Sequence, residues 1–261
     1  GYRLALVTDR RGENYGGTLG SLDNHKIRAG GIAGKSILAR FKSVPELALG
    51  TLQARSLLRR LKPRVVVGFG GYASVPAMLA AAFADCRTAI HEQNAILGRA
   101  NRLLAGRVDR IAVSFEETRA LPEGADAKTV HTGMPVRSAV AALRDNSYPE
   151  INDDGPIHVF VIGGSQGARV LSDIVPAGLT ALPDALRARL RVVQQCRPED
   201  LDRVRRAYAG AGISAELASF FDDVPARLVA CHLVIGRAGA STVAEITTIG
   251  RPAVLVPYPH A

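Results

Sequence analysis

A chain of 261 residues with 47% hydrophobic content can form one large or two ordinary domains with a buried core. Its three cysteines lie far apart, which excludes a CxxC metal or redox motif and favours a reducing compartment, and no apolar run reaches the ~18 residues of a membrane span. The net charge of +9 lies in residues 1–150, which hold 22 Lys and Arg against 13 Asp and Glu, whereas residues 151–261 hold 11 of each; this asymmetry indicates an anionic partner for the first part or a solubilising surface.

Short apolar runs, many of them β-branched, alternate along the chain with stretches of helical length and composition. Continuous apolar strands separated by helices are typical of parallel sheets that are covered on both faces. The fold class predicted from this pattern is α/β. In chain order, the predicted strands are Leu4–Val7, Val65–Val67, Thr88–Ile90, Arg110–Val113, Val159–Ile162, Leu190–Val193, Leu233–Ile235 and Ala253–Val256.

The polar, turn-rich stretch at residues 143–156 has the composition of a linker. We therefore predict two doubly wound, Rossmann-like domains, one at residues 1–142 and the other at residues 157–261. In such folds ligands bind beyond the carboxyl ends of the strands, so the turns from strand to helix are where a site is expected.

Three of these turns are rich in glycine: "GFGGYAS" from residue 68, "GGSQGA" from residue 163 and "GRAGAST" from residue 236. Residues without a Cβ let backbone N–H groups approach a ligand, and the dipole of the following helix favours an anion there. A single turn of this kind is ordinary in α/β proteins. Three of them in two domains predict phosphate-bearing ligands that enter a cleft from both sides.

Several other site classes lose support. The turns lack the GxGxxG spacing of a dinucleotide site and the GxxxxGK[ST] spacing of a P-loop. An aromatic content of 5% and the lack of a recognised motif argue against nucleic-acid binding. Asp222 and Asp223 could form a metal-binding pair, but we expect a helix N-cap before Val224 and Pro225. The histidines show no metal-ligand spacing.

The segments "GFGGYASVP", "HEQNAILGRANRLLA", "GMPVR", "GGSQGA", "FFDDV" and "RAGASTVAEITTIGRPAVLVPYPHA" occur in this order and span nearly the whole chain. Together they resemble the MurG family, which transfers N-acetylglucosamine from UDP-N-acetylglucosamine to the undecaprenyl-pyrophosphoryl-muramoyl-pentapeptide lipid of peptidoglycan synthesis. The resemblance implies a GT-B architecture with two domains facing a cleft, both incomplete here. It also implies an inverting transfer to the 4-hydroxyl of the muramoyl unit, with neither a metal nor another cofactor.

The resemblance places the donor site mostly in the second domain. It implies that Ser165 contacts the UDP pyrophosphate and that Arg137 contributes to the donor site at the junction of the two domains. It also implies that the backbone of Phe221 recognises uracil and that Glu245 accepts hydrogen bonds from the ribose hydroxyls. A carboxylate suits a vicinal diol because it accepts two charge-assisted hydrogen bonds. We also expect Arg237 to bind a phosphate rather than a neighbouring acid. The other implied donor residues are Asn94 for the sugar, and Ala240, Ser241, Thr242, Val243 and Ala244 along the nucleotide phosphates.

The acceptor side is expected in the first domain. The resemblance implies that Gly70, Gly71 and Tyr72 form a loop near the acceptor's pyrophosphate, and the "HE" of "HEQN" adds His91 and Glu92 to this side. His91 ends a strand, where catalytic residues are often found. A hydrogen-bonded structural histidine is an equally good interpretation.

The general base is left unassigned because this sequence has no counterpart of the family's "GGTGGH"-type loop. The sequence also stops at "PYPHA", before a glutamine with which the family contacts the donor. Met134 stands where the family usually has Asn in "GNPVR", which affects the geometry around Arg137. We therefore expect this polypeptide by itself to be catalytically impaired.

The basic first domain suggests peripheral, salt-sensitive association with the anionic cytoplasmic face of the bacterial inner membrane. The expected partners are UDP-N-acetylglucosamine, the undecaprenyl-linked muramoyl-pentapeptide and this membrane surface. The alternatives are another GT-B enzyme that uses a UDP-sugar, and a non-catalytic fragment that binds one. The segment "AGKSILARFKSV" mixes the apolar and basic residues that interfacial docking needs: Ile37, Leu38 and Phe41 with Lys35, Arg40 and Lys42. The alternative for this segment is an ordinary amphipathic helix packed on the sheet.

Overall fold

The computed structural model describes residues 2–9, 17–29, 37–164 and 169–258, leaving aside the side chains of residues 17, 18 and 37–44. The chain divides into two compact units, Gly1–Gly133 and Met134–Ala261. The predicted first domain extends beyond this boundary to residue 142, and the predicted linker at 143–156 lies within the second unit.

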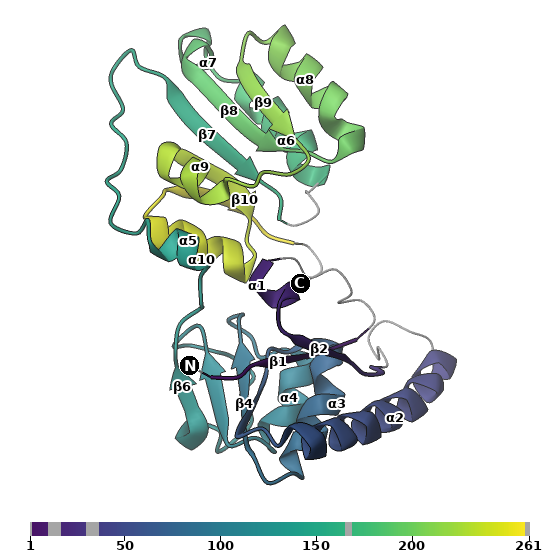
Figure 1. The fold of residues 1–261 in the computed structure, drawn as a ribbon. Coiled ribbons are helices and arrows are strands. Elements are labelled where there is room, and N and C mark those ends of the chain that lie inside the picture. The colour runs from purple at the N-terminus through teal and green to yellow at the C-terminus, as the bar shows by residue number, and fades with distance from the viewer. Residues whose placement is uncertain (1, 10–16, 30–36, 165–168, 259–261) are drawn as a thin grey trace. The chain divides into compact units, whose positions relative to one another are not determined.

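The described part of the first unit contains two parallel sheets (Figure 1). The smaller one pairs β1 (Ala5–Thr8) with β2 (Asp23–Lys26). The larger one takes its strands in chain order: β3 (Val65–Gly68), β4 (Arg87–Glu92), β5 (Arg110–Val113) and β6 (Thr129–His131). Because the strands run parallel, the turns that follow them meet at one edge of the sheet.

One face of the larger sheet is covered by helices. Met78 of α3 and Leu104 of α4 pack with Ile90 and Ile111 of the sheet in a fully buried cluster. On the opposite face, the described part of the chain leaves the side chains of Val65, Val67 and Val130 exposed to solvent, by 54%, 47% and 48%. This face departs from the expectation of a sheet covered on both sides. The helices of this unit are α1 (Gly17–Gly20), α2 (Ile37–Leu61), α3 (Gly71–Ala82) and α4 (Arg99–Ala105).

The second unit contains one parallel sheet with the strand order β11-β10-β7-β8-β9 (Figure 1). The chain starts at the central β7, builds outward through β8 and β9, and then returns to the other side of β7 with β10. The strand order therefore reverses between β7 and β10, which is where doubly wound folds bind ligands. The strands are β7 (Ile157–Ile162), β8 (Leu190–Gln195), β9 (Ser214–Ala218), β10 (Leu233–Arg237) and β11 (Ala253–Val256).

Both faces of this second sheet are covered. Successive side chains of β7 point to opposite sides of the sheet, and those on each side lie in a buried cluster. Val159 and Val161 lie in one buried cluster with Tyr208 of α8, whereas Phe160 lies in another with Ile246 of α10. The helices are α5 (Ser138–Ala141), α6 (Arg169–Thr180), α7 (Asp184–Arg189), α8 (Leu201–Gly210), α9 (Val224–Ala230) and α10 (Ala240–Ile249).

The segment from α5 to residue 156 is bound to the second unit rather than free as a linker. Val140 is fully buried in the same cluster as Phe160. The hydroxyl of Tyr148 donates to the carbonyl of His232 over 2.9 Å. This segment therefore has the turn-rich composition of a linker but is docked on the second unit.

All eight predicted strands are confirmed, with shifts of up to a few residues at their ends. Three further strands were missed: β2, β6 and β9. Each lies at the edge of its sheet, where a neighbour is present on one side only. An edge strand needs no continuous apolar run, so these segments lack the pattern that marked the others.

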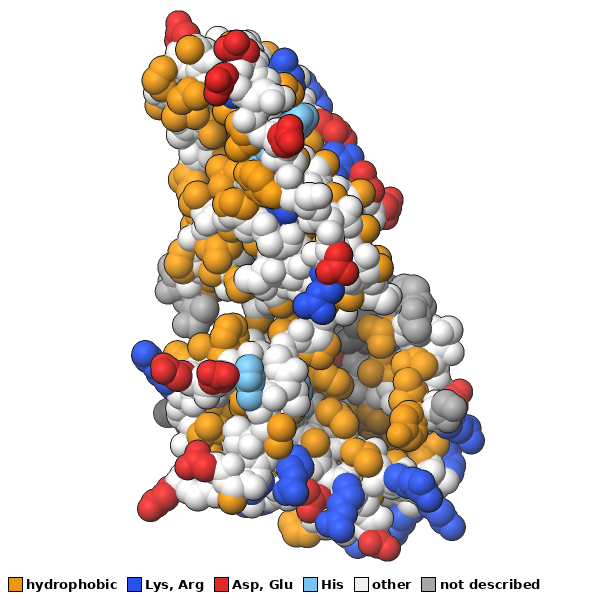
Figure 2. Space-filling model, turned by 90° about the vertical axis from the view of Figure 1, so that its left-hand side faces the viewer, with side chains coloured by type: hydrophobic (Ala, Val, Ile, Leu, Met, Phe, Trp, Pro, Cys, Tyr) orange, Lys and Arg blue, Asp and Glu red, His pale blue; other side chains and the backbone are white. Residues whose placement is uncertain are grey.

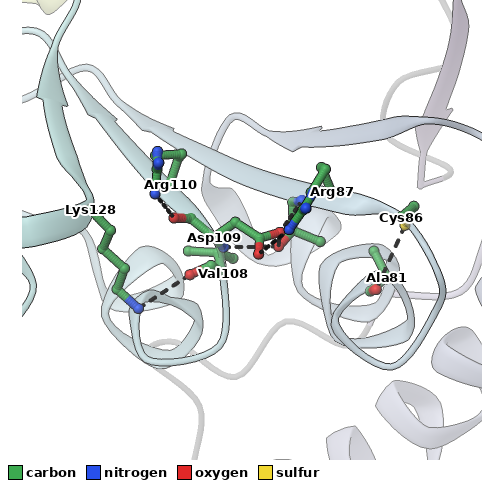
Figure 3. Close-up of polar contacts among 8 residues, drawn as sticks. Ala81, Cys86, Arg87, Val108, Asp109, Arg110 and Lys128 are labelled. Atoms are coloured by element: carbon green, nitrogen blue, oxygen red, sulfur yellow. Dashed lines mark hydrogen bonds and ion pairs between the residues drawn. The ribbon is translucent and has the colours of Figure 1, made fainter.

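Asp109 fastens the amino-terminal ends of β4 and β5 (Figure 3). Its Oδ2 accepts hydrogen bonds from the backbone N–H of Thr88 over 2.7 Å and from its hydroxyl over 3.0 Å, and the guanidinium of Arg87 lies 3.7 Å from Oδ1. The hydrogen bonds from Thr88 lower the pKa of Asp109. This cluster lies at the edge opposite the glycine turns, and we assign it a structural role.

Candidate functional site

The second unit brings two glycine turns together where its strand order reverses. Gly163 and Gly164 follow β7, and Gly239 ends the turn after the neighbouring β10. A Cβ on Gly236 would lie only 3.2 Å from the carbonyl oxygen of Ile162, so the two strands approach closely here. Ser165, the predicted pyrophosphate ligand in the first of these turns, lies outside the described residues.

The start of α10 has the properties of an anion site. Gly239 precedes the helix, and the N–H of Val243 makes the first helical hydrogen bond, to the carbonyl of Gly239 over 2.9 Å. The N–H groups before it have no partner within the helix, and the first turn carries no acidic residue. The predicted donor residues Ala240 to Ala244 form this first turn and the next, and Ser241 is exposed.

Glu245, predicted to bind the ribose, and Arg137, predicted for the donor site at the domain junction, are paired with each other. The Nε and Nη2 of Arg137 donate to the two carboxylate oxygens of Glu245 over 2.7 and 2.8 Å. The Glu245 side chain is 14% exposed, and its hydrogen bonds raise the pKa of Arg137. A carboxylate has about four acceptor positions. The guanidinium uses two of them and leaves two for other donors.

Arg237 contacts no acid among the described residues, so the alternative of a neighbouring carboxylate finds no support. Its Nη1 donates to the carbonyl of Pro257 over 2.8 Å, and its guanidinium lies 5.5 Å from the ring centroid of Tyr258. This cation–π contact holds the side chain over the end of β11. The guanidinium keeps further N–H donors for a ligand.

Phe221 is buried, so its predicted contact with uracil falls to the backbone. Its ring packs edge-on against Phe160, with centroids 6.1 Å apart, and the guanidinium of Arg227 lies 4.2 Å above it. Asp223 stands at the N-cap position of α9 but makes no capping bond with its side chain, because the carboxylate accepts from Nε of Arg227 over 2.7 Å. No group of metal ligands occurs among the described residues.

Gln195 was missed by sequence reasoning. It is 5% exposed at the end of β8, where its Oε1 accepts from the N–H of Gly163 over 3.3 Å. Its Nε2 donates to the carbonyl of Ser219 over 3.2 Å. The side chain thus ties the glycine turn after β7 to the loop that leads to Phe221. A buried amide at the end of an apolar strand was the signal for it.

His91 is buried at the end of β4 with both ring nitrogens in hydrogen-bond contact. Nε2 lies 3.2 Å from the carbonyl oxygen of Gly133, and Nδ1 lies 3.1 Å from Nε2 of Gln93. The tautomer that satisfies both contacts carries its proton on Nε2, because a carbonyl can only accept. This arrangement fits the structural interpretation of His91.

Glu92 is 2% exposed, and the described hydrogen bonds to its carboxylate come from residues 94–101, which follow it in the sequence. Oε1 accepts from the backbone N–H and the side-chain amide of Asn94 over 3.0 and 3.1 Å. Oε2 accepts from the N–H of Gly98 and the amide of Asn101, both over 2.8 Å. Burial by itself raises the pKa of Glu92, but these bonds outweigh it and lower the pKa. Glu92 therefore shapes the loop that presents Asn94.

Gly70 and Gly71 form the turn between β3 and α3, with φ angles of 78° and 69°. Only glycine adopts the combination of φ 78° and ψ −168° at Gly70 without strain. The turn opens directly into α3, whose first residues include Tyr72. A helix start with left-handed glycines suits a phosphate ligand, as predicted for the acceptor side.

Parallel sheets with glycine turns after their strands fit the GT-B class of glycosyltransferases, and the family matches and a solved structure support this class. Residues 1–113 match the glycosyltransferase family 28 N-terminal domain, and residues 158–261 match the glycosyltransferase family 28 C-terminal domain. The UDP-N-acetylglucosamine–N-acetylmuramyl-(pentapeptide) pyrophosphoryl-undecaprenol N-acetylglucosamine transferase of Paramagnetospirillum magneticum is 64% identical over 261 residues, which are 100% of this chain and 70% of that protein.

A transferase of the same name from Rhodospirillum rubrum is 56% identical over 100% of this chain and 67% of its own length. The crystal structure of Acinetobacter baumannii MurG has a TM-score of 0.69 at 28% identity and is matched over 93% of this chain and 64% of its own. The chain belongs to the glycosyltransferase family 28 N-acetylglucosaminyltransferases of peptidoglycan synthesis. The predicted family, fold class and enzyme class are confirmed.

Proposed function

We propose that this chain transfers N-acetylglucosamine from UDP-N-acetylglucosamine to muramoyl-pentapeptide pyrophosphoryl-undecaprenol, with the donor nucleotide in the second unit and the acceptor at the first. The reaction is the one for which its relatives are named. The observation that carries the donor assignment is the carboxylate of Glu245, fixed by Arg137 one turn into α10.

In the donor site, the N–H groups at the start of α10, which have no partner within the helix, bind the phosphates, and Ser241 and Thr242 add hydroxyl donors. The carboxylate of Glu245 accepts from the ribose diol with the positions that Arg137 leaves open. On the first unit, Asn94 contacts the donor sugar with its amide oxygen, to which no described residue donates.

The chemistry is an in-line displacement in which the UDP leaving group gains negative charge. The start of α10, together with Arg237, stabilises this charge without a metal or another cofactor. The Gly70–Tyr72 turn holds the acceptor's pyrophosphate. A general base takes the proton of the acceptor hydroxyl. Glu92 and His91 are engaged in internal hydrogen bonds, so this role stays unassigned.

Calorimetry with three nucleotides tests the donor assignment. UDP-N-acetylglucosamine is expected to bind, UDP-glucose to bind at least about tenfold more weakly because it lacks the acetamido group, and NAD not to bind. Binding of NAD in place of the UDP-sugars would contradict the proposal. Equal binding of both UDP-sugars would favour another UDP-sugar-dependent GT-B enzyme.

No described helix is long and apolar enough to cross a membrane. We further propose peripheral binding to the anionic cytoplasmic face of the inner membrane through the first unit. Figure 2 shows Lys and Arg side chains with hydrophobic ones between them on this unit. On α2, Arg55 and Arg59 are exposed one turn apart beside Leu52, which is 62% exposed. The side chains of the segment at 35–42, predicted to dock, lie outside the described residues.

Vesicle flotation tests this surface. Reversal of charge in Arg55→Glu/Arg59→Glu is expected to lower binding to vesicles with anionic lipid about tenfold or more, because each basic residue near such a surface contributes about 1 kcal/mol. Added salt should weaken binding of the unaltered chain in the same way. The matched control is Arg205→Glu/Arg206→Glu, which reverses two exposed arginines on α8 of the second unit. Binding that ignores salt and anionic lipid would contradict the proposal.

A further inference from the structure

Asn101 is a buried residue that connects two motifs of the first unit. It lies in α4 and is 2% exposed. Its Nδ2 donates to the carbonyl of His91 over 3.2 Å and to Oε2 of Glu92 over 2.8 Å. Both partners can only accept at these atoms, so the orientation of the Asn101 amide is fixed. The amide nitrogen faces the end of β4.

The Asn101 amide also lies beside the glycine turn after β3, close to where a side chain at position 70 would begin. A Cβ built on Gly70 would lie 3.3 Å from Nδ2 and 3.6 Å from Oδ1 of Asn101. Oδ1 is buried and has no hydrogen-bond partner among the described residues. Such an atom is rare in a folded protein because burial without a partner is unfavourable. The amide that carries this oxygen lies beside the turn that opens into the twelve-residue helix α3.

The carboxylate of Glu92 links Asn101 to Asn94 through hydrogen bonds. One carboxylate oxygen is held by Asn101 and by the N–H of Gly98, and the other accepts both donors of Asn94. A change at Asn101 therefore alters Asn94 through one shared carboxylate. Hydrogen bonds thus run from Asn101 through Glu92 to Asn94, while the Asn101 amide lies beside Gly70.

We propose that Asn101 is a positioning residue for glycosyl transfer, because its amide occupies the space beside Gly70 of the acceptor turn and, through Glu92, fixes Asn94 of the donor-sugar contact. It touches neither substrate and acts through Glu92 and Gly70. The inference rests on the proposed function, since it takes the substrates of the two residues from there. Misplacement of a reacting group by about 1 Å can lower a rate about 100-fold, so this geometry affects turnover more than binding.

Steady-state kinetics of the protein that carries this chain test the role. Asn101→Asp places an oxygen against two acceptors, the carbonyl of His91 and Oε2 of Glu92, and is expected to lower kcat about 100-fold. Asn101→Ala removes the contacts without repulsion and is expected to lower kcat about tenfold. In both variants KM for UDP-N-acetylglucosamine should change by less than about threefold.

Rescue separates positioning from a loss of folding. In Glu92→Gln/Asn101→Asp, the glutamine amide donates to the new carboxylate but also meets the N–H of Gly98, so kcat is expected to recover about threefold over Asn101→Asp. The matched control is Asn24→Asp, the same change at an exposed position of β2. Unchanged kcat in Asn101→Ala, a loss equal to the unfolded fraction measured by thermal unfolding, or no recovery in the double variant would overturn the inference. An unaltered protein that transfers no N-acetylglucosamine would instead overturn the proposed function.

Discussion

Glu245→Gln is expected to weaken binding of UDP-N-acetylglucosamine about 30- to 100-fold. Hydrogen bonds to a charged group contribute about 1.5–3 kcal/mol each, and the variant weakens two of them to the ribose diol. It also replaces one acceptor of Arg137 with an NH2 group that points at the guanidinium. The carboxylate therefore loses both its charge and its fixed orientation. Titration calorimetry measures the change directly.

The same variant should lose discrimination against a 2′-deoxy donor. In the unaltered chain, removal of one ribose hydroxyl leaves an acceptor of Glu245 without its donor, and binding should fall about tenfold. Glu245→Gln should bind both donors about equally. The matched control is Glu199→Gln, an exposed glutamate of the second unit. If Glu245→Gln kept the affinity of the unaltered chain, or kept the discrimination, Glu245 would not be the ribose ligand.

Arg137→Lys separates orientation from charge in this site. Lysine keeps the positive charge but cannot make the bidentate contact. If Arg137 positions Glu245, Arg137→Lys should weaken donor binding less than Glu245→Gln does, because it acts on the donor only through the orientation of Glu245. The double variant should then be no weaker than Glu245→Gln alone.

The sequence predicted the strands that carry a continuous apolar run, and the described strands that it missed all lie at sheet edges. Residues Val159–Ile162 are all apolar because both faces of β7 are covered, and β10 and β8 are its neighbours. Asp23–Lys26 forms β2 with a sequence that is polar throughout, since among the described strands it pairs with β1 alone. Pairing with a neighbour, rather than local pattern, decides such a strand.

The site was predicted as a set of residues but not as a set of contacts. Glu245 and Arg137 were both named, yet their pairing across 108 positions follows from the packing of α5 on α10, which no local pattern shows. His91 and Glu92 were expected at the acceptor, whereas their polar atoms make hydrogen bonds within the chain. Gln195 and Asn101 had no motif to mark them. His91, Glu92, Gln195 and Asn101 have their hydrogen-bond partners because they are buried, and burial depends on the tertiary fold.

Arg251 carries the largest expected effect on stability. It is 6% exposed in the second unit, and its guanidinium lies 5.5 Å from the ring centroid of Tyr148. Its donors reach five backbone carbonyls at 2.9 to 3.4 Å, those of Ser147, Leu228, Val229, Ile249 and Gly250. The side chain thus joins the segment before β7 to the ends of α9 and α10. These carbonyls have the planar donor fork of an arginine as their shared partner.

Arg251→Ala is expected to lower the free energy of unfolding of the second unit by about 3–5 kcal/mol, since it leaves several buried carbonyls without a donor and opens a cavity beside Tyr148. Arg251→Lys should cost less, because one ammonium still reaches some of them. Urea unfolding gives the change as a lower midpoint at constant slope. Hydrogen exchange should show faster opening in α9 and α10 and little change in the first unit.

The control for Arg251→Ala is Arg191→Ala, which removes an exposed arginine of β8 that donates to the nearby carbonyls of Ala188 and Leu190. Its effect should stay within about 0.5 kcal/mol, because water replaces the lost donors at an exposed site. If the two variants were equally stable, the docking of residues 143–156 would depend on Tyr148 and Val140 rather than on the guanidinium. The comparison therefore tests whether the segment with a linker's composition is held in place by one buried charge.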